Sequence, residues 1–93
     1  MLSQIPINLE KIRKEDLEKE ILRVGMIAEL DAINLYEQLT AYAQSENVKK
    51  VLLDIAKEEK THVGEFQALL LKEDAEQSKE LEEGKKEVEE LTG

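Results

Sequence analysis

The chain has 93 residues, enough for one small domain, of which 41% are hydrophobic and 38% charged, a balance typical of amphipathic helices. Its 22 acidic and 13 basic residues leave a formal net charge of -9, which argues against nucleic acid or an anionic membrane as a partner and suits the attraction of cations. The absence of cysteine excludes disulfides and every cysteine-ligated metal site. No apolar run approaches about 18 residues, and residues 1–6 lack a signal-peptide pattern, so we expect a cytoplasmic protein that does not span a membrane.

The low aromatic content of 3% and the single proline, Pro6, favour an all-α fold after a lead-in over residues 1–13. From about Lys14 to Ala43, apolar residues recur at steps of three to five, which predicts one long helix. Gly25 lies among them, at a place where a second helix is expected to approach closely.

The polar stretch over residues 44–47 predicts a turn with capping residues, and the helical pattern resumes from about Val48 to Lys72. The two helices are therefore expected to form a long antiparallel hairpin. Such a hairpin cannot cover both of its own apolar faces, so we expect a second copy of the chain to complete a four-helix bundle.

The composition changes after Lys72, where Asp74 followed by Gln77 resembles a helix-capping box. The rest of the chain is nearly all charged, with only a thin apolar stripe. Residues 74–93 are thus either a short third helix packed on a neighbour or a solvated acidic tail. Since no linker divides the sequence, residues 1–93 are expected to form a single domain.

Three side chains suited to metal binding fall on the apolar faces of the predicted helices. Glu29 keeps the register of Leu22 and Ile33 on the first helix, whereas Glu59 and His62, the only histidine, share the inner face of the second. Carboxylates and an imidazole are costly to bury unless something pairs with them, and a metal ion would do so.

Two such hairpins would supply four carboxylates and two imidazoles, which is the ligand set of ferritin-like di-iron bundles. Because one chain carries half of this set, the site would form between two copies. Iron fits these ligands in both of its oxidation states, and manganese or zinc could occupy them too. Tyr36, two turns after Glu29 on the same face, is a candidate to hydrogen-bond to a ligand or to a bound oxidant.

Each of these residues also has a plainer interpretation. Glu-x-x-His alone is a weak indication in a chain with 18 glutamates, a lone histidine is commonly a core residue, and so is a tyrosine such as Tyr36. Glu29 could instead reach water from the edge of the apolar stripe. Asp31 and Glu58 lie off the inward faces, so we expect both to be solvated, with the capture of cations as a weaker alternative.

The run from Ile27 to Glu37, followed by Glu59 to Phe66, resembles the encapsulated ferritins, most nearly their archaeal members, and the resemblance covers about residues 14–93. The separation of 30 residues between Glu29 and Glu59 is far more specific to this group than Glu-x-x-His alone.

This resemblance implies half-ferritin hairpins that pair to build a di-iron ferroxidase centre, with Glu29, Glu59 and His62 as iron ligands and Tyr36 as their neighbour. It also implies annular decamers that are cargo of an encapsulin nanocompartment, where oxidised iron is stored. Two features depart from the family. Residues 91–93 lack a targeting peptide, so the sequence is either cut short or continues into the shell protein. Asp31 could serve among the acids that guide iron inward, whereas Ala28 cannot.

We therefore expect a ferroxidase that converts Fe(II) to Fe(III) with dioxygen or peroxide. Two alternatives stay open. A rubrerythrin-like peroxide reductase would use the same ligands, but its usual attached electron supply needs cysteine. A non-catalytic helical assembly module would pair its buried acids with lysines.

Overall fold

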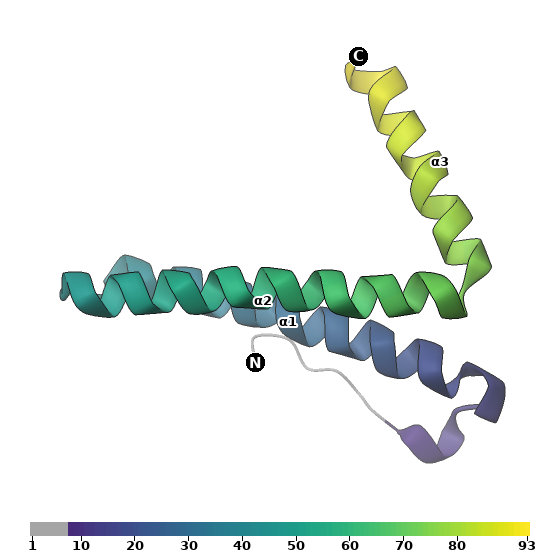
Figure 1. Cartoon of the computed structure of the whole chain (residues 1–93), viewed down its shortest axis with the longest axis horizontal. Coiled ribbons are helices and arrows are strands. Elements are labelled where there is room, and N and C mark those ends of the chain that lie inside the picture. The colour runs from purple at the N-terminus through teal and green to yellow at the C-terminus, as the bar shows by residue number, and fades with distance from the viewer. Residues whose placement is uncertain (1–7) are drawn as a thin grey trace.

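The computed structural model describes residues 8–93, and every element in this range is helical. Two short 3-10 turns, Leu9–Lys11 and Lys14–Asp16, lead into α1 (Leu17–Tyr42), which is followed by α2 (Glu46–Glu73) and α3 (Ala75–Thr92). In Figure 1, α1 and α2 lie side by side and run in opposite directions, and α3 leaves the far end of α2 at a steep angle. The predicted all-α fold with a long antiparallel hairpin is therefore confirmed. The first part of the predicted lead-in, residues 1–7, lies outside the described residues.

The predicted turn between the two long helices is confirmed, and its cap explains where α2 begins. The Ser45 hydroxyl accepts a hydrogen bond from the Val48 backbone amide at 3.3 Å, so α2 begins at Glu46, two residues earlier than predicted. The first long helix, α1, begins at Leu17 rather than at about Lys14 as predicted, because Lys14–Asp16 form a 3-10 turn in front of it.

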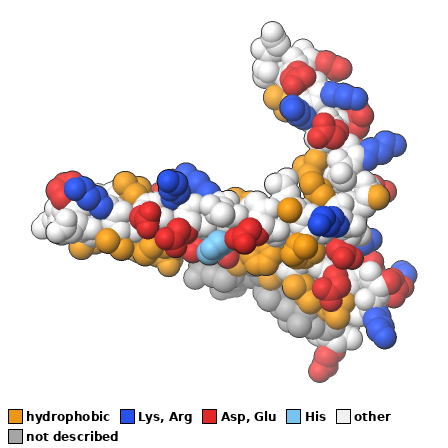
Figure 2. All heavy atoms as spheres, in the orientation of Figure 1, with side chains coloured by type: hydrophobic (Ala, Val, Ile, Leu, Met, Phe, Trp, Pro, Cys, Tyr) orange, Lys and Arg blue, Asp and Glu red, His pale blue; other side chains and the backbone are white. Residues whose placement is uncertain are grey.

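The hairpin buries a small apolar seam along the line where α1 and α2 meet. Leu22 and Ile33 of α1 and Ala56 and Leu70 of α2 are buried there. Among the described residues, twelve large apolar side chains are at least 40% exposed, nine on the hairpin and three on α3, and the space-filling view shows orange side chains along the hairpin (Figure 2). They are Ile21, Ile27, Leu30, Leu39, Tyr42, Val48, Val51, Leu53, Leu69, Leu81, Val88 and Leu91. A hairpin alone therefore leaves much of its apolar surface in contact with water, as expected from the sequence.

The acidic C-terminal segment is a helix rather than an irregular tail. Asp74, the one residue between α2 and α3, uses both carboxylate oxygens at this junction. Its Oδ1 accepts a hydrogen bond from the Gln77 backbone amide at 3.0 Å, and its Oδ2 accepts one from the Arg23 guanidinium of α1 at 2.8 Å. The cap that the sequence predicted is present, and it also ties the start of α3 to α1.

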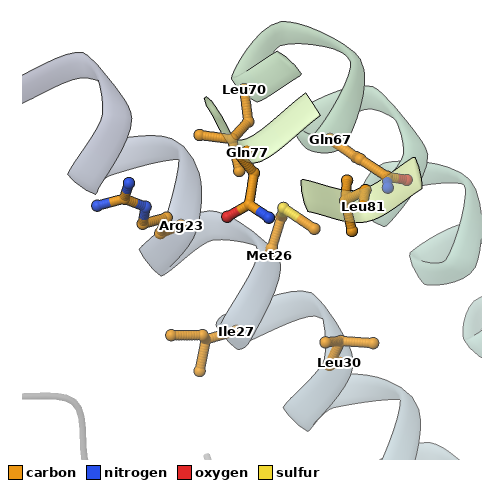
Figure 3. A pocket seen from close by; sticks show the side chains of 8 residues that line it. All are labelled: Arg23, Met26, Ile27, Leu30, Gln67, Leu70, Gln77 and Leu81. Carbon is orange, nitrogen blue, oxygen red and sulfur yellow. The ribbon is translucent and has the colours of Figure 1, made fainter. Parts of the chain in front are cut away.

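The corner where the three helices meet holds a groove of about 340 Å³. Side chains from all three helices line it, as Figure 3 shows. They are Arg23, Met26, Ile27, Leu30, Gln67, Leu70, Gln77 and Leu81. This groove is a further part of the apolar surface that the chain does not cover by itself. None of the helices over residues 8–93 is long and apolar enough to cross a membrane.

Candidate metal centre

Glu29, Glu59 and His62 meet in the middle of the hairpin. Glu29 points across from α1, while Glu59 and His62 lie one turn apart on α2. His62 Nδ1 is 3.3 Å from Glu29 Oε2 and 3.3 Å from Glu59 Oε2. One ligand atom from each residue lies within 4.8 Å of the other two. The hairpin thus brings together the three residues that sequence register placed on facing stripes.

These three side chains differ in how far they are shielded from water. The Glu29 and Glu59 side chains are 19% and 18% exposed, whereas the His62 side chain is 45% exposed. Figure 2 shows the one histidine of the chain, in pale blue, at the surface between acidic side chains. A groove of about 370 Å³ opens beside it, lined by Glu29, His62, Glu65, Phe66 and Leu69. The cluster is therefore an open surface site with one apolar wall.

The donor set fits a divalent metal such as iron, manganese or zinc. Carboxylate oxygen and imidazole nitrogen are donors that these metals accept. When two donor atoms each lie roughly 2.1 Å from one metal ion and the donor–metal–donor angle is slightly larger than a right angle, the two donors are roughly 3.3 Å apart. The distances from His62 Nδ1 to the two carboxylates match this separation, although they are long for ordinary hydrogen bonds.

Tyr36 does not join the cluster. It is half-buried on α1, two turns beyond Glu29, and only its backbone carbonyl accepts a hydrogen bond, from the Thr40 hydroxyl at 2.8 Å. Within residues 8–93 no hydrogen bond links its phenol to Glu29, Glu59 or His62. Its predicted place beside the ligands stays a prediction.

The prediction for Asp31 is wrong, whereas that for Glu58 is confirmed. Asp31 is only 7% exposed and takes part in a polar or electrostatic interaction, so it is not a solvated acid. The prediction took only the faces that carry the candidate ligands as inward, whereas Asp31 is in register with Val24 and Leu35, seven residues before it and four after it on α1. Glu58 is exposed, as expected.

Glu65, Phe66 and Leu69 belong to the candidate site, although the sequence reading gave them no role in it. They line the groove with Glu29 and His62. Their positions three, four and seven residues after His62 place them on the same helix face, so the spacing itself was the available signal.

Comparison with known proteins points to one group. The profile of the Rubrerythrin family matches residues 20–92. The ferritin-like–encapsulin shell fusion protein of Pyrococcus furiosus is 59% identical over 95 residues, an alignment that covers 100% of this chain and 28% of that protein. The crystal structure of the encapsulated ferritin domain from Pyrococcus furiosus superimposes with a TM-score of 0.85 and 58% identity. That match covers 100% of this chain and 97% of the crystallised one, so the chain spans one domain's length but only 28% of the fusion relative.

Proposed function

This chain belongs to the rubrerythrin family, as a domain of the encapsulated-ferritin kind, and from that premise we propose that it oxidises Fe(II) to Fe(III) at a di-iron centre shared by two copies. The observation that carries the proposal is the convergence of Glu29, Glu59 and His62, with one ligand atom each within 4.8 Å. One hairpin offers two carboxylates and one imidazole, and two hairpins would complete the ligand set of a di-iron carboxylate bundle.

The openness of the cluster favours a centre shared between copies. His62 is 45% exposed and stands at the mouth of a groove, so the single chain shields only one side of a bound ion. A second copy related by a two-fold axis would bring the same three residues from the other side. Leu69, an exposed apolar side chain in the wall of this groove, favours the same arrangement.

In the proposed reaction Fe(II) is the substrate, and the side chains bind it and favour its oxidised form. Glu29 and Glu59 supply anionic oxygen donors, which stabilise Fe(III) more than Fe(II) because the attraction grows with the charge of the ion. His62 supplies a neutral nitrogen donor, while Phe66 and Leu69 keep one wall of the groove apolar. Two Fe(II) ions each lose one electron to dioxygen, which takes up two protons and leaves as hydrogen peroxide. Tyr36 is proposed to hydrogen-bond near the bound ions in the assembled protein.

The wider setting of this chemistry is also a proposal. The Pyrococcus furiosus relative joins a ferritin-like part to an encapsulin shell in one protein. We infer that residues 1–93 form one half-ferritin domain that assembles into a homo-oligomer, an annular decamer by resemblance to the encapsulated ferritins. Its Fe(III) would be stored inside an encapsulin nanocompartment.

Oxidation of ferrous salt in air tests the proposed function. The full chain is mixed with Fe(II) near neutral pH and the rise of ferric absorbance is followed. We expect Glu59→Ala and His62→Ala to lower the rate at least about a hundredfold, since each loses a ligand from both halves of the centre. Glu58→Ala is the matched control, because this neighbouring acid is exposed and outside the cluster, and it should oxidise iron like the unmodified chain.

Two outcomes would contradict the proposal. If the unmodified chain oxidises iron no faster than buffer, it is not a ferroxidase. If hydrogen peroxide is consumed catalytically only when a reductant is supplied, while Fe(II) and dioxygen alone give no turnover, the peroxide-reductase alternative is favoured instead.

A further inference from the structure

One turn away from the candidate ligands, α1 and α2 approach each other through a glycine. Gly25 precedes Glu29 by four residues on α1, and Phe66 follows His62 by four residues on α2. Because the helices are antiparallel, the step from Glu29 to Gly25 and the step from His62 to Phe66 run in the same direction along the hairpin. Each step of four residues covers about 6 Å. The contact between Gly25 and Phe66 is therefore the layer of packing next to the one where Glu29 meets His62.

There is no room for a side chain on Gly25. A Cβ placed there would lie 2.8 Å from Cε1 and 2.9 Å from Cζ of the Phe66 ring. Carbon atoms in contact normally stay about 3.5 Å apart or more. No glycine among residues 8–93 has a positive φ, so this position uses the small size of glycine rather than its backbone freedom. Gly25, Gly64 and Gly84 all lie inside helices, where glycine is unfavourable, but only Gly25 among these three has a neighbouring side chain within 4 Å of an added Cβ.

We propose that the contact between Gly25 and Phe66 sets the separation of α1 and α2, and so positions Glu29 and His62 to bind one metal ion together. Phe66 also forms part of the wall of the groove that Glu29 and His62 line. A side chain at position 25 would either push the helices apart or turn the ring into this groove. Either movement disturbs the 3.3 Å approach of Glu29 Oε2 to His62 Nδ1. The inference rests on the proposed metal site and assigns positioning roles to residues that bind no metal.

Three glycine variants and one compensating variant separate positioning from general stability. Gly25→Ala introduces the clash. Gly64→Ala and Gly84→Ala are matched controls, because an added Cβ at either residue has no atom within 4 Å. Gly25→Ala combined with Phe66→Leu keeps the total side-chain volume nearly constant and removes the two ring atoms nearest the new methyl group.

The readout is binding of Co(II), a redox-stable divalent probe, to the full chain by calorimetric titration. Helical content, thermal midpoint and solution mass are measured on the same samples. We expect Gly25→Ala to bind Co(II) about tenfold more weakly or worse while staying helical, and both control variants to bind like the unmodified chain. The double variant should recover most of the affinity. A merely structural role for Gly25 would change the thermal midpoint and leave the affinity unchanged.

Unaltered Co(II) affinity in folded Gly25→Ala would overturn the positioning role, as would equal losses in the control variants. If Gly25→Ala does not fold, the double variant decides, since weak binding by a folded double variant overturns the inference and full binding supports it. Absence of Co(II) binding by the unmodified chain would overturn both this inference and the proposed function. Normal Co(II) binding with no Fe(II) oxidation would overturn the proposed function alone.

Discussion

Among the three candidate ligands, two carboxylates share a single possible hydrogen-bond donor, the Nδ1 atom of His62. His62 Nδ1 lies 3.3 Å from a carboxylate oxygen of Glu29 and equally far from one of Glu59. A single ring nitrogen carries at most one hydrogen, so it can donate well to only one of them. Both carboxylates are about four-fifths shielded from water, which makes the missing partner costly. A cation at this point would be shared by all three donors, and that is the chemical reason for preferring a metal site to a simple hydrogen-bonded cluster.

Register along a helix was enough to predict that the three candidate ligands face one another, but not to predict every residue around them. Glu29 and His62 were predictable because helical periodicity sets the direction of a side chain whatever the tertiary detail. The burial of Asp31 was missed because only the faces that carry the candidate ligands were taken as inward, although Asp31 keeps the register of Val24 and Leu35 on another side of α1. The part played by Phe66 depends on its distance to Gly25 on the other helix, which no spacing within one helix reveals.

Tyr36 can be tested by removing its hydroxyl group alone. In the single chain the phenol makes no hydrogen bond to the described ligands, so it is not expected to hold the metal itself. Tyr36→Phe should leave Co(II) affinity within about twofold and slow Fe(II) oxidation by about tenfold to a hundredfold, the size of effect expected for a neighbour of the ligands. Metal titration and the ferric absorbance assay measure the two quantities separately. A large loss of affinity would instead make the phenol a ligand, and an unchanged rate would remove it from the site.

At the scale of helices, the hairpin was predictable and the direction of α3 was not. Two long amphipathic patterns joined by a short capped turn leave antiparallel packing as the simple solution. The thin apolar stripe after Asp74 could not distinguish a helix from a tail. Once formed, α3 takes its direction partly from the pairing of Asp74 with Arg23, a contact between residues 51 apart in sequence.

The ionisation of Asp74 stabilises the junction where α3 meets the hairpin. Its pKa lies below the ordinary value of 3.8, chiefly because the carboxylate accepts the hydrogen bond of the Gln77 backbone amide. Burial raises the pKa, whereas the hydrogen bond from the Arg23 side chain and the charges of Lys19 and Arg23 lower it further. A carboxylate whose pKa is lower in the folded state stabilises that state above pH 3.8, and this contribution is lost as the pH falls through the folded pKa.

Two variants of Asp74 test this contribution. Asp74→Asn keeps an oxygen that can cap Gln77 but removes the charge that Arg23 pairs with, whereas Asp74→Ala removes both. Both should be less stable than the unmodified chain in urea unfolding at about pH 7, and Asp74→Ala more so. The difference in unfolding free energy between each variant and the unmodified chain should stay constant down to about pH 5 and shrink below pH 3.8. At that low pH the Asp74 carboxylate of the unmodified chain becomes protonated and loses the charge that the variants lack at every pH. Asp54→Asn, at an exposed position of α2, is the control. A difference that persists undiminished to about pH 2 would contradict the role of ionisation.

For the whole molecule, the open site and the exposed apolar surface raise the same requirement. The groove beside His62 exposes Leu69, and the corner groove exposes Ile27, Leu30 and Leu81. Apolar surface of this extent is normally covered by another protein surface. The net charge of -9 opposes association of identical chains, so a cation held at the contact would help to offset the repulsion. Assembly and metal binding are therefore expected to reinforce each other.

Mixed assemblies can distinguish a shared centre from one built within each chain. Unmodified and His62→Ala chains are unfolded together in equal amounts, refolded and assayed for Fe(II) oxidation. His62 suits this purpose because its side chain is the most exposed of the three ligands, so its removal should disturb packing least. If each centre needs both chains of a two-fold pair, only pairs of two unmodified chains keep all six ligands, and random mixing leaves about one quarter of the activity.

A centre contained in one chain would instead retain about one half of the activity at the same mixture, because each unmodified chain would work whatever its partner. Mixing after separate refolding supplies the control, since chains that do not exchange must also give about one half. Varying the mixture sharpens the comparison, because activity should follow the square of the unmodified fraction for a shared centre and the fraction itself for an independent one. A linear dependence after joint refolding would contradict the shared centre even if every chain bound iron. A square dependence would mean that the chain's unit of function is the pair of hairpins.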